Sequence, residues 1–341
     1  MMDSDPPLHK AYETLFNKTV GGGGGKFSVH NGTNYNHEPL VVVNECDLPL
    51  IDLRLLELGE AEREECKSRI ARASQEWGFF QVVNHGISRE LSEKMRSEQE
   101  KAFNQPFEDK YQKFSAGCYR WGTPTATCLR QLSWSEAFHV PLDNIIHPGS
   151  DNAPNSLSST MEKFAATVSS LALKLAEILA EKLGHDSTFF RENCLPSTCY
   201  LRMNRYPPCP VPSEVFGLMP HTDSDYLTIL LQDQVGGLQL VKDGKWISVK
   251  PNHEALVINI GDLFQAWSND VYKSVEHRVV TNAQVERFST AYFLCPSYDT
   301  VIESCCEPSV YRKFSFREYR QQVQEDVTNL GFKIGLPRFL V

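Results

Sequence analysis

The chain has 341 residues, of which 41% are hydrophobic and 23% are charged, a globular composition that excludes global disorder. Its formal net charge of −9 and the lack of a long lysine or arginine cluster argue against a nucleic-acid or anionic membrane partner. No apolar run approaches the ~20 residues that a membrane-spanning helix needs, so we do not expect a membrane protein.

The first residues and the cysteines bear on the cellular compartment. The N-terminus lacks a basic region followed by an apolar stretch, so we expect no secretory signal. The 10 cysteines form no Cys-x-x-Cys pair and no spacing typical of a disulfide framework, which indicates reduced thiols in a cytoplasmic protein. The sequence does not indicate the oligomeric state.

Composition and pattern divide the chain into five parts. The glycine tract at 21–25, followed by asparagine, histidine and glycine residues, predicts a flexible leader. The expected parts are the leader at 1–45, an N-terminal module at 46–157, a bracing helix at 158–195, a core of short strands at 196–297, and a C-terminal helix and tail at 298–341.

Within the N-terminal module, short apolar runs at 48–53 and 77–86 predict strands. Apolar residues at helical spacing predict a helix between these two strands. Ser88 suits the N-cap of a second helix, which stops before Pro106. The stretch up to residue 157 is expected to be rich in loops.

The clearest helix is expected from Ser159 to Leu183. Its apolar residues recur at helical spacing and its charged residues face away, which predicts a core-packing helix rather than a cofactor-binding segment. Gly184 is a residue type that commonly ends a helix. The apolar stripe consists of Met161, Phe164, Val168, Leu171, Leu175, Ile178 and Leu179.

From residue 198 the pattern changes to short strands separated by turn residues. Strands in this number after a helical block predict an α+β fold, in which a jelly-roll barrel (a double-stranded β-helix) is braced by N-terminal and C-terminal helices. Ser315 and Glu318 have the spacing of a capping box at the start of a last helix. Phe314 and Tyr319 suit the hydrophobic staple of that helix. The strands are expected at 198–206, 217–223, 227–232, 237–241, 245–249, 255–260, 274–280 and 287–295.

Three residues have the chemistry of a metal site. His221 and Asp223 lie two apart, and on a strand such residues point to the same face, as two ligands of one divalent ion would. The alternative is a solvated loop or a hydrogen-bonded pair. His277 lies inside an apolar strand, where a buried imidazole needs a partner. It is either a core histidine satisfied by hydrogen bonds or the third ligand of a non-haem Fe(II) facial triad.

A second group of polar residues shares strand faces in the same way. Arg287 and Ser289 lie two apart, and a guanidinium beside a hydroxyl suits a carboxylate. An arginine inside a barrel is costly unless an anion pairs with it. On an earlier strand, Asn204 and Tyr206 share a polar face with Arg202, which indicates a site for a polar ligand.

Together these motifs resemble the Fe(II)/2-oxoglutarate-dependent dioxygenases of plants, and the segments 48–52 and 77–86 are similar to the N-terminal module of that family. The resemblance covers residues 46–330. It implies that Fe(II) and 2-oxoglutarate bind, that O2 is a cosubstrate, and that ascorbate serves as reductant. The implied site residues are His221, Asp223 and His277 for iron, Arg287 and Ser289 for the distal carboxylate of 2-oxoglutarate, and Tyr206 and Asn204 as further cofactor-binding residues.

The resemblance narrows to the gibberellin 2-oxidases, and is closest to the branch that acts on C20 gibberellin precursors. It rests on the segments 119–122, 133–139 and 216–230. It implies 2β-hydroxylation of a gibberellin, which inactivates the hormone or its precursor. The aromatic residues of this region either belong to the core or line the substrate pocket, and we assign Tyr119, Trp134 and Phe138 to the pocket.

Arg202 is expected to meet a carboxylate of the gibberellin, the alternative being a protein carboxylate near the barrel rim. Two other functions stay open. One is a sister dioxygenase, such as a gibberellin 3- or 20-oxidase or a flavonoid oxygenase. The other is a non-enzymatic hormone-binding protein on the same fold, against which the intact triad and Arg287 argue.

Overall fold

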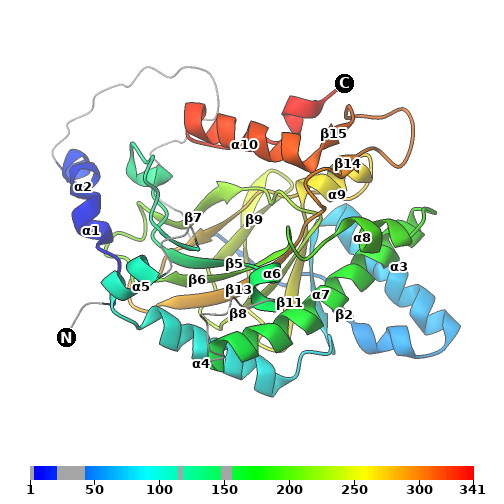
Figure 1. Ribbon diagram of the computed structural model, residues 1–341, viewed down its shortest axis with the longest axis horizontal. Helices are drawn as coiled ribbons and strands as arrows, with labels where there is room; N and C mark the ends of the chain where they lie inside the picture. The colour runs from blue at the N-terminus through cyan, green and yellow to red at the C-terminus, as the bar shows by residue number, and fades with distance from the viewer. Residues whose placement is uncertain (1–3, 21–42, 114–117, 147–155) are drawn as a thin grey trace.

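The computed structural model describes residues 4–20, 43–113, 118–146 and 156–341, which form two large β-sheets surrounded by helices (Figure 1). The strands are β1 (Glu45–Cys46), β2 (Leu50–Asp52), β3 (Phe79–Val83), β4 (Tyr119–Trp121), β5 (Glu136–Pro141), β6 (Tyr200–Tyr206), β7 (Phe216–His221), β8 (Leu227–Gln232), β9 (Leu238–Lys242), β10 (Lys245–Val249), β11 (Leu256–Ile260), β12 (His277–Val280), β13 (Arg287–Leu294), β14 (Val301–Ile302) and β15 (Phe314–Ser315). The helices are α1 (Leu8–Ala11), α2 (Glu13–Val20), α3 (Glu60–Glu76), α4 (Arg89–Phe103), α5 (Phe107–Lys113), α6 (Leu142–Ile146), α7 (Ser156–Lys182), α8 (Thr188–Asn193), α9 (Asp262–Trp267) and α10 (Phe316–Leu330). Short 3-10 helices are η1 (Leu53–Glu57), η2 (Leu129–Gln131) and η3 (Leu336–Phe339).

The predicted jelly-roll and the α+β fold class are confirmed. One sheet has the strand order β1-β10-β9-β12-β7, and the other has the order β2-β3-β11-β8-β13-β6-β5-β4. Every strand predicted after residue 198 is present, as β6 to β13. The N-terminal part adds β2 and β3 to one edge of the larger sheet and β5 and β4 to the other. The division of the chain into modules stays a prediction.

Helix α7 forms as predicted and braces the larger sheet. All residues of its apolar stripe are buried, and the helix packs against α3, α4, β8 and β13 (Figure 1). Burying one such side chain stabilises the fold by roughly 1.5–3 kcal/mol. The helices therefore cover one face of this sheet, and its other face is free to line a site.

Strands β4 and β5 lie in a stretch that the sequence predicted to be rich in loops. They form because β5 pairs with β6 along its length, and β4 pairs with β5. A short strand at a sheet edge is specified by the strand it pairs with, and that pairing leaves little trace in local sequence.

The prediction that residues 1–45 form a flexible leader is wrong for the part of it that the structure describes. Residues 8–20 form α1 and α2, and Leu8, Leu15 and Phe16 are buried. Asp5 also forms a salt bridge of 2.8 Å with Arg205 of β6. The glycine tract lies outside the described residues. These helices are too short to be predicted from hydrophobic periodicity, and the residues they pack against are distant in sequence.

The last helix begins as predicted. The Ser315 side chain accepts a hydrogen bond from the backbone N–H of Glu318, and the rings of Phe314 and Tyr319 pack with centroids 5.8 Å apart. Helix α10 then crosses one end of the barrel, at the top of Figure 1. Among the residues with described positions, no helix has both the length and the apolar character to cross a membrane.

Candidate active site

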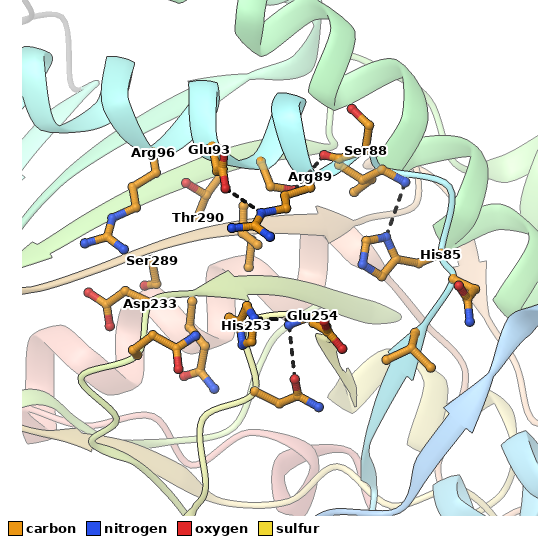
Figure 2. A pocket seen from close by; sticks show the side chains of 18 of the residues that line it. His85, Ser88, Arg89, Glu93, Arg96, Asp233, His253, Glu254, Ser289 and Thr290 are labelled. Atoms are coloured by element: carbon orange, nitrogen blue, oxygen red, sulfur yellow. Dashed lines mark hydrogen bonds and ion pairs between the residues drawn. The ribbon is translucent and has the colours of Figure 1, made fainter.

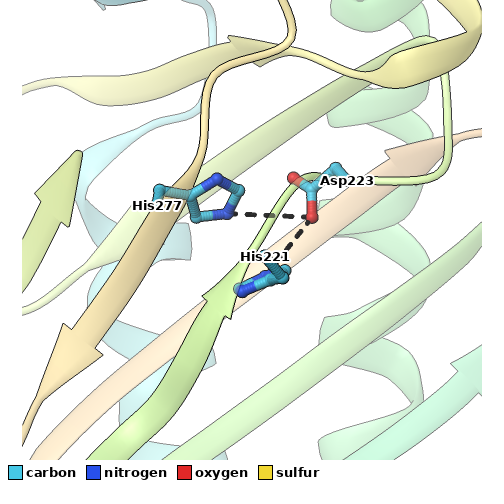
Figure 3. Close-up of side chains that lie close together, drawn as sticks. All are labelled: His221, Asp223 and His277. Carbon is cyan, nitrogen blue, oxygen red and sulfur yellow. Dashed lines mark ion pairs between the residues drawn. The ribbon is translucent and has the colours of Figure 1, made fainter. Parts of the chain in front are cut away.

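Strand pairing brings the three predicted metal ligands together (Figure 3). Strand β7 ends at His221 and β12 begins at His277, and these two residues are direct partners in the antiparallel pair. Asp223 follows two residues after His221. Its Oδ1 lies 3.7 Å from Nε2 of His221 and 3.8 Å from Nε2 of His277. One ligand atom from each residue lies within 4.8 Å of the other two.

Hydrogen bonds fix which nitrogen of each imidazole is available. Nδ1 of His221 lies 2.7 Å from the carbonyl of Met219, and Nδ1 of His277 lies 3.1 Å from the carbonyl of Val275. A carbonyl only accepts, so each Nδ1 carries the proton and each Nε2 keeps its lone pair. Burial lowers the pKa of His221 to about 3, which keeps that imidazole neutral.

The carboxylate of Asp223 is oriented by two neighbours that sequence reasoning missed. Its Oδ2 accepts hydrogen bonds from Thr228 Oγ1 at 2.5 Å and from Asn259 Nδ2 at 2.8 Å, which leaves Oδ1 toward the histidines. Burial alone would raise the pKa of Asp223, but the two histidines and these hydrogen bonds lower it to about 2. The sequence did contain a signal for Asn259, which is a polar residue in the otherwise apolar strand β11.

This donor set suits ferrous iron. Two neutral imidazole nitrogens and one ionised carboxylate oxygen converge from one side, which is the ligand set of non-haem Fe(II) oxygenases. The hydrogen bonds from the ligands to backbone carbonyls and side chains are the outer-shell contacts that orient metal ligands in proteins.

A buried arginine lies near the triad, without an acidic partner among the described residues. Arg287 is 3% exposed and directly opposes Tyr206 across β13 and β6, with its guanidinium 5.0 Å from the ring centroid. Ser289 opposes Asn204 in the same ladder. These pairs confirm that the four residues predicted for 2-oxoglutarate lie together on the strand face that lines the cavity.

The hydrogen bonds of Arg287 leave room for an anion. Its Nη2 donates to Gln232 Oε1 at 3.0 Å and its Nη1 approaches Ser289 Oγ at 3.5 Å, while its Nε has no partner. A buried guanidinium without a carboxylate is unfavourable unless a ligand supplies the negative charge. The sequence did not single out Gln232, which shares this environment.

A cavity of about 860 Å³ contains both groups of residues. Its walls come from both sheets, and Val323 and Val327 of α10 close one side. Arg120, Arg202 and Arg320 also line it. The triad, Arg287 and these arginines therefore line one cavity.

A larger hollow, of about 1110 Å³, lies beside α4 and shares Ser289 with the smaller cavity (Figure 2). It contains none of the triad residues. Its acidic and basic side chains neutralise each other, as in the 2.6 Å ion pair of Arg89 with Glu93. The smaller cavity is therefore the candidate active site, because it holds the convergent ligands and the unpaired charge.

The structure corrects the assignment of Tyr119, Trp134 and Phe138 to the substrate pocket, since all three belong to the core. The Tyr119 hydroxyl donates to Glu136 at 2.5 Å. Trp134 packs against the ring of Phe16, with centroids 6.0 Å apart. Tyr119 and Phe138 oppose each other across β4 and β5, and both turn away from the cavity.

Strand parity explains this correction. Because alternate residues of a strand face opposite sides, the neighbour Arg120, rather than Tyr119, lines the cavity. Arg202 also lines it, and its Nε donates to Asn204 Oδ1 at 2.8 Å. Among the described residues, Arg202 has no carboxylate partner. The structure therefore does not show the alternative, in which Arg202 pairs with a protein carboxylate near the barrel rim.

Comparisons with known proteins agree with this geometry. Residues 197–296 match the 2OG-Fe(II) oxygenase superfamily, and residues 48–159 match the family described as non-haem dioxygenase in morphine synthesis N-terminal. The chain is 63% identical over 340 residues to gibberellin 2-beta-dioxygenase 8 of Arabidopsis thaliana, covering 98% of both chains. It is 55% identical over 307 residues to gibberellin 2-beta-dioxygenase 6 of Oryza sativa subsp. japonica, covering 87% of this chain and 86% of that relative.

A solved structure supports the fold. The crystal structure of JOX2 in complex with 2OG, Fe and JA superposes with a TM-score of 0.73 at 32% sequence identity, over 83% of this chain and 87% of that one. The matched family and the triad in the cavity therefore give Fe(II) as the cofactor and 2-oxoglutarate as the cosubstrate of this protein. The chain belongs to the 2OG-Fe(II) oxygenase superfamily and, within it, to the gibberellin 2-beta-dioxygenases.

Proposed function

We propose that this protein hydroxylates carbon 2 of gibberellins, with C20 precursors as preferred substrates, and thereby inactivates them. The observation that carries the proposal is the coincidence, in one cavity, of the triad and the buried Arg287, which has no carboxylate partner among the described residues. A binding protein without catalysis has no use for both an iron site and an anchor for a keto acid.

Each residue group has a distinct role in this proposal. His221, Asp223 and His277 hold Fe(II) through Nε2, Oδ1 and Nε2. When bound, the iron with 2-oxoglutarate and O2 supplies the oxidising power that inserts one oxygen atom into a C–H bond, while 2-oxoglutarate gives succinate and CO2.

The cosubstrate is held at its other end by Arg287 and Ser289. The guanidinium and the hydroxyl donate to the distal carboxylate, and Tyr206 packs over the guanidinium while Asn204 supports Ser289. Buried Gln99 of α4 donates to the backbone carbonyls of Asn204 and Ser289 at 3.0 and 2.9 Å, which holds the two strands in place.

The rest of the cavity suits an amphipathic acid. Tyr200 and Phe293 stack with centroids 4.4 Å apart and present an apolar wall, and Val323 and Val327 face them from α10. These groups exclude water from the reacting carbon and orient it. Arg202 is proposed to receive a carboxylate of the gibberellin. We further propose a cytoplasmic location, ascorbate as reductant, and no nucleic-acid or membrane partner.

Product analysis tests the proposal. Purified protein is incubated with Fe(II), 2-oxoglutarate, ascorbate and a panel of C19 and C20 gibberellins, and products are identified by mass spectrometry. We expect 2β-hydroxylated C20 gibberellins and one succinate for each hydroxyl group formed. Conversion of a C20 gibberellin to the aldehyde or the C19 lactone would identify a 20-oxidase, and activity on flavonoids alone would reject the hormone assignment.

A further inference from the structure

Three arginines of the active-site cavity have no carboxylate partner. Among the residues with described positions, no acid lies within ion-pair distance of Arg120, Arg202 or Arg320, although all three line the cavity. Such an excess is unexpected in a protein whose net charge is −9. An anionic ligand in the cavity therefore meets positive charge beyond that of Arg287, which is proposed to hold 2-oxoglutarate.

Strand register places two of these arginines on one surface. Arg120 opposes Ala137 across β4 and β5, and Ala137 opposes Asn204 across β5 and β6. Two residues further along β5, His139 opposes Arg202 of β6. Residues two apart on a strand share a face, so Arg120 and Arg202 flank the small Ala137 and face the same cavity as Asn204.

Arg320 lines the same cavity from a different element. It lies on α10, which lies above the sheets in Figure 1. Burial lowers the pKa of His139 to about 4, and the positive charges of Arg120, Arg202 and Arg320 act in the same direction. All three guanidinium groups therefore act on one histidine from three different elements.

The other charges of the cavity are already matched. Arg317 pairs with Asp299 at 2.9 Å, and Lys333 pairs with Asp262 at 2.8 Å. Within the described lining the acidic residue is Asp223, which is proposed to bind iron. Arg120 and Arg320 are exposed to solvent and Arg202 is half-buried, so a carboxylate of the substrate would replace water at the first two and give Arg202 an anionic partner.

We infer that Arg120, Arg202 and Arg320 form a carboxylate subsite that selects gibberellins with two free carboxyl groups over those with one. The inference rests on the proposed function. A C20 gibberellin precursor keeps as a free acid the carboxyl group that a C19 gibberellin closes into a lactone. Three guanidinium groups match a dianion better than a monoanion, because each carboxylate accepts charge-assisted hydrogen bonds from two donors.

The experiment compares kcat and KM for a C20 diacid gibberellin and a C19 lactone gibberellin in the wild type and in Arg120→Met, Arg202→Met and Arg320→Met. Methionine keeps the apolar stem and removes the charge. Each loss of a charge-assisted bond is expected to raise KM for the diacid by roughly 10- to 150-fold. KM for the lactone should rise less than KM for the diacid. KM for 2-oxoglutarate should stay at the wild-type value.

Arg317→Met is the matched control. Arg317 lies on α10, as Arg320 does, and lines the same cavity, but it is paired with Asp299. It should leave the diacid-to-lactone ratio of kcat/KM unchanged. Dissociation constants of the diacid and of its monomethyl esters, measured without O2, give a second readout. In the wild type one of the esters should bind roughly tenfold more weakly than the diacid, and this difference should shrink in Arg202→Met.

Two results would overturn different claims. A wild-type protein that forms no hydroxylated gibberellin overturns the proposed function. A wild-type protein that forms the product, with an unchanged diacid-to-lactone ratio in all three arginine variants, overturns the subsite and leaves the function standing. The melting temperature of each variant is measured to verify that it is folded. A change in the diacid-to-lactone ratio of kcat/KM is then not caused by unfolding.

Discussion

His277 directly opposes His221 in the antiparallel pair of β12 and β7, and their ring centroids lie 4.3 Å apart. The ladder register shifts immediately after His277, between it and Val279. Irregularities of this kind re-aim side chains near active sites. Strand pairing, rather than proximity in sequence, therefore assembles the metal site, and Asp223 completes it from the turn that follows His221.

Removing the carboxylate of Asp223 should abolish iron binding without unfolding the barrel. Asp223→Ala takes away the one anionic ligand and leaves both imidazoles in place. Metal analysis of the purified protein should show loss of stoichiometric iron, and turnover should be lost with it. Asp225→Asn is the control, because Asp225 is a buried carboxyl nearby that is not one of the three proposed ligands, and burial raises its pKa well above the usual value. Wild-type iron content in Asp223→Ala would refute the ligand assignment.

Arg287→Met should weaken the binding of 2-oxoglutarate and leave the binding of the gibberellin nearly unchanged. The variant loses the buried guanidinium that is 3% exposed and has an unpartnered Nε, so KM for 2-oxoglutarate should rise by roughly 10- to 150-fold. Equilibrium binding of the gibberellin should change little, in contrast to Arg202→Met. The assignment fails if the two variants show the same pattern of effects on the two ligands.

Lys333 ties the C-terminal segment to the metal-binding turn. Its Nζ donates to the carbonyl of Thr222 at 2.8 Å and to Ser224 Oγ at 2.9 Å, and it pairs with the buried Asp262. Lys333→Met should lower the free energy of unfolding by about 3–5 kcal/mol, because it leaves a buried carboxylate without its cation. Urea unfolding measures this loss.

The matched variant for this prediction is Lys333→Met combined with Asp262→Asn, which removes both charges. Asp262 Oδ1 also accepts a hydrogen bond from Ser274 Oγ, and its Oδ2 accepts from Tyr319 Oη and Thr222 Oγ1. The amide of asparagine keeps one acceptor oxygen, and a hydroxyl group at its other end rotates to accept from the NH2 group. The double variant should therefore be more stable than Lys333→Met alone. If both variants unfold at the same urea concentration, the ion pair is not the source of the loss.

His139 should make stability depend on pH. Its pKa falls from 6.5 to about 4 on folding, through burial and the nearby arginines. Between these values the unfolded chain binds a proton that the folded protein does not, so the free energy of unfolding decreases as the pH falls. The contribution is complete above pH 6.5 and is lost on acidification by at most about 1.4 kcal/mol per pH unit.

Urea unfolding of the apoprotein at about pH 7 and about pH 5 measures this dependence. His139→Gln should lose less stability than the wild type between the two conditions, since it has no imidazole to protonate. The comparison of the two proteins cancels the other groups that titrate in this range. An identical pH dependence in both proteins would contradict the prediction.

Local sequence patterns were sufficient to predict the strand-rich core, the long bracing helix and the polar residues that line the cavity, while the resemblance to the dioxygenases supplied the roles proposed for those residues. Strand parity places Arg287 with Ser289 on a common face, whereas Asp223 lies beyond the end of β7 at His221, so the turn rather than parity brings it beside His221. The apolar stripe of α7 and the Ser315 cap were equally local signals. Each of these features depends on residues a few positions apart, which is the range over which periodicity carries information.

Tertiary contacts decide which residues outside those motifs enter the cavity. They turn Tyr119 and Phe138 into the core and Arg120 toward the site, because β4 and β5 join the sheet through pairing with β6. They also bury Leu8, Leu15 and Phe16 and bring Thr228 and Asn259 to Asp223. These outcomes follow from register and contacts between distant segments, and a one-residue change of register would face the opposite side chains inward.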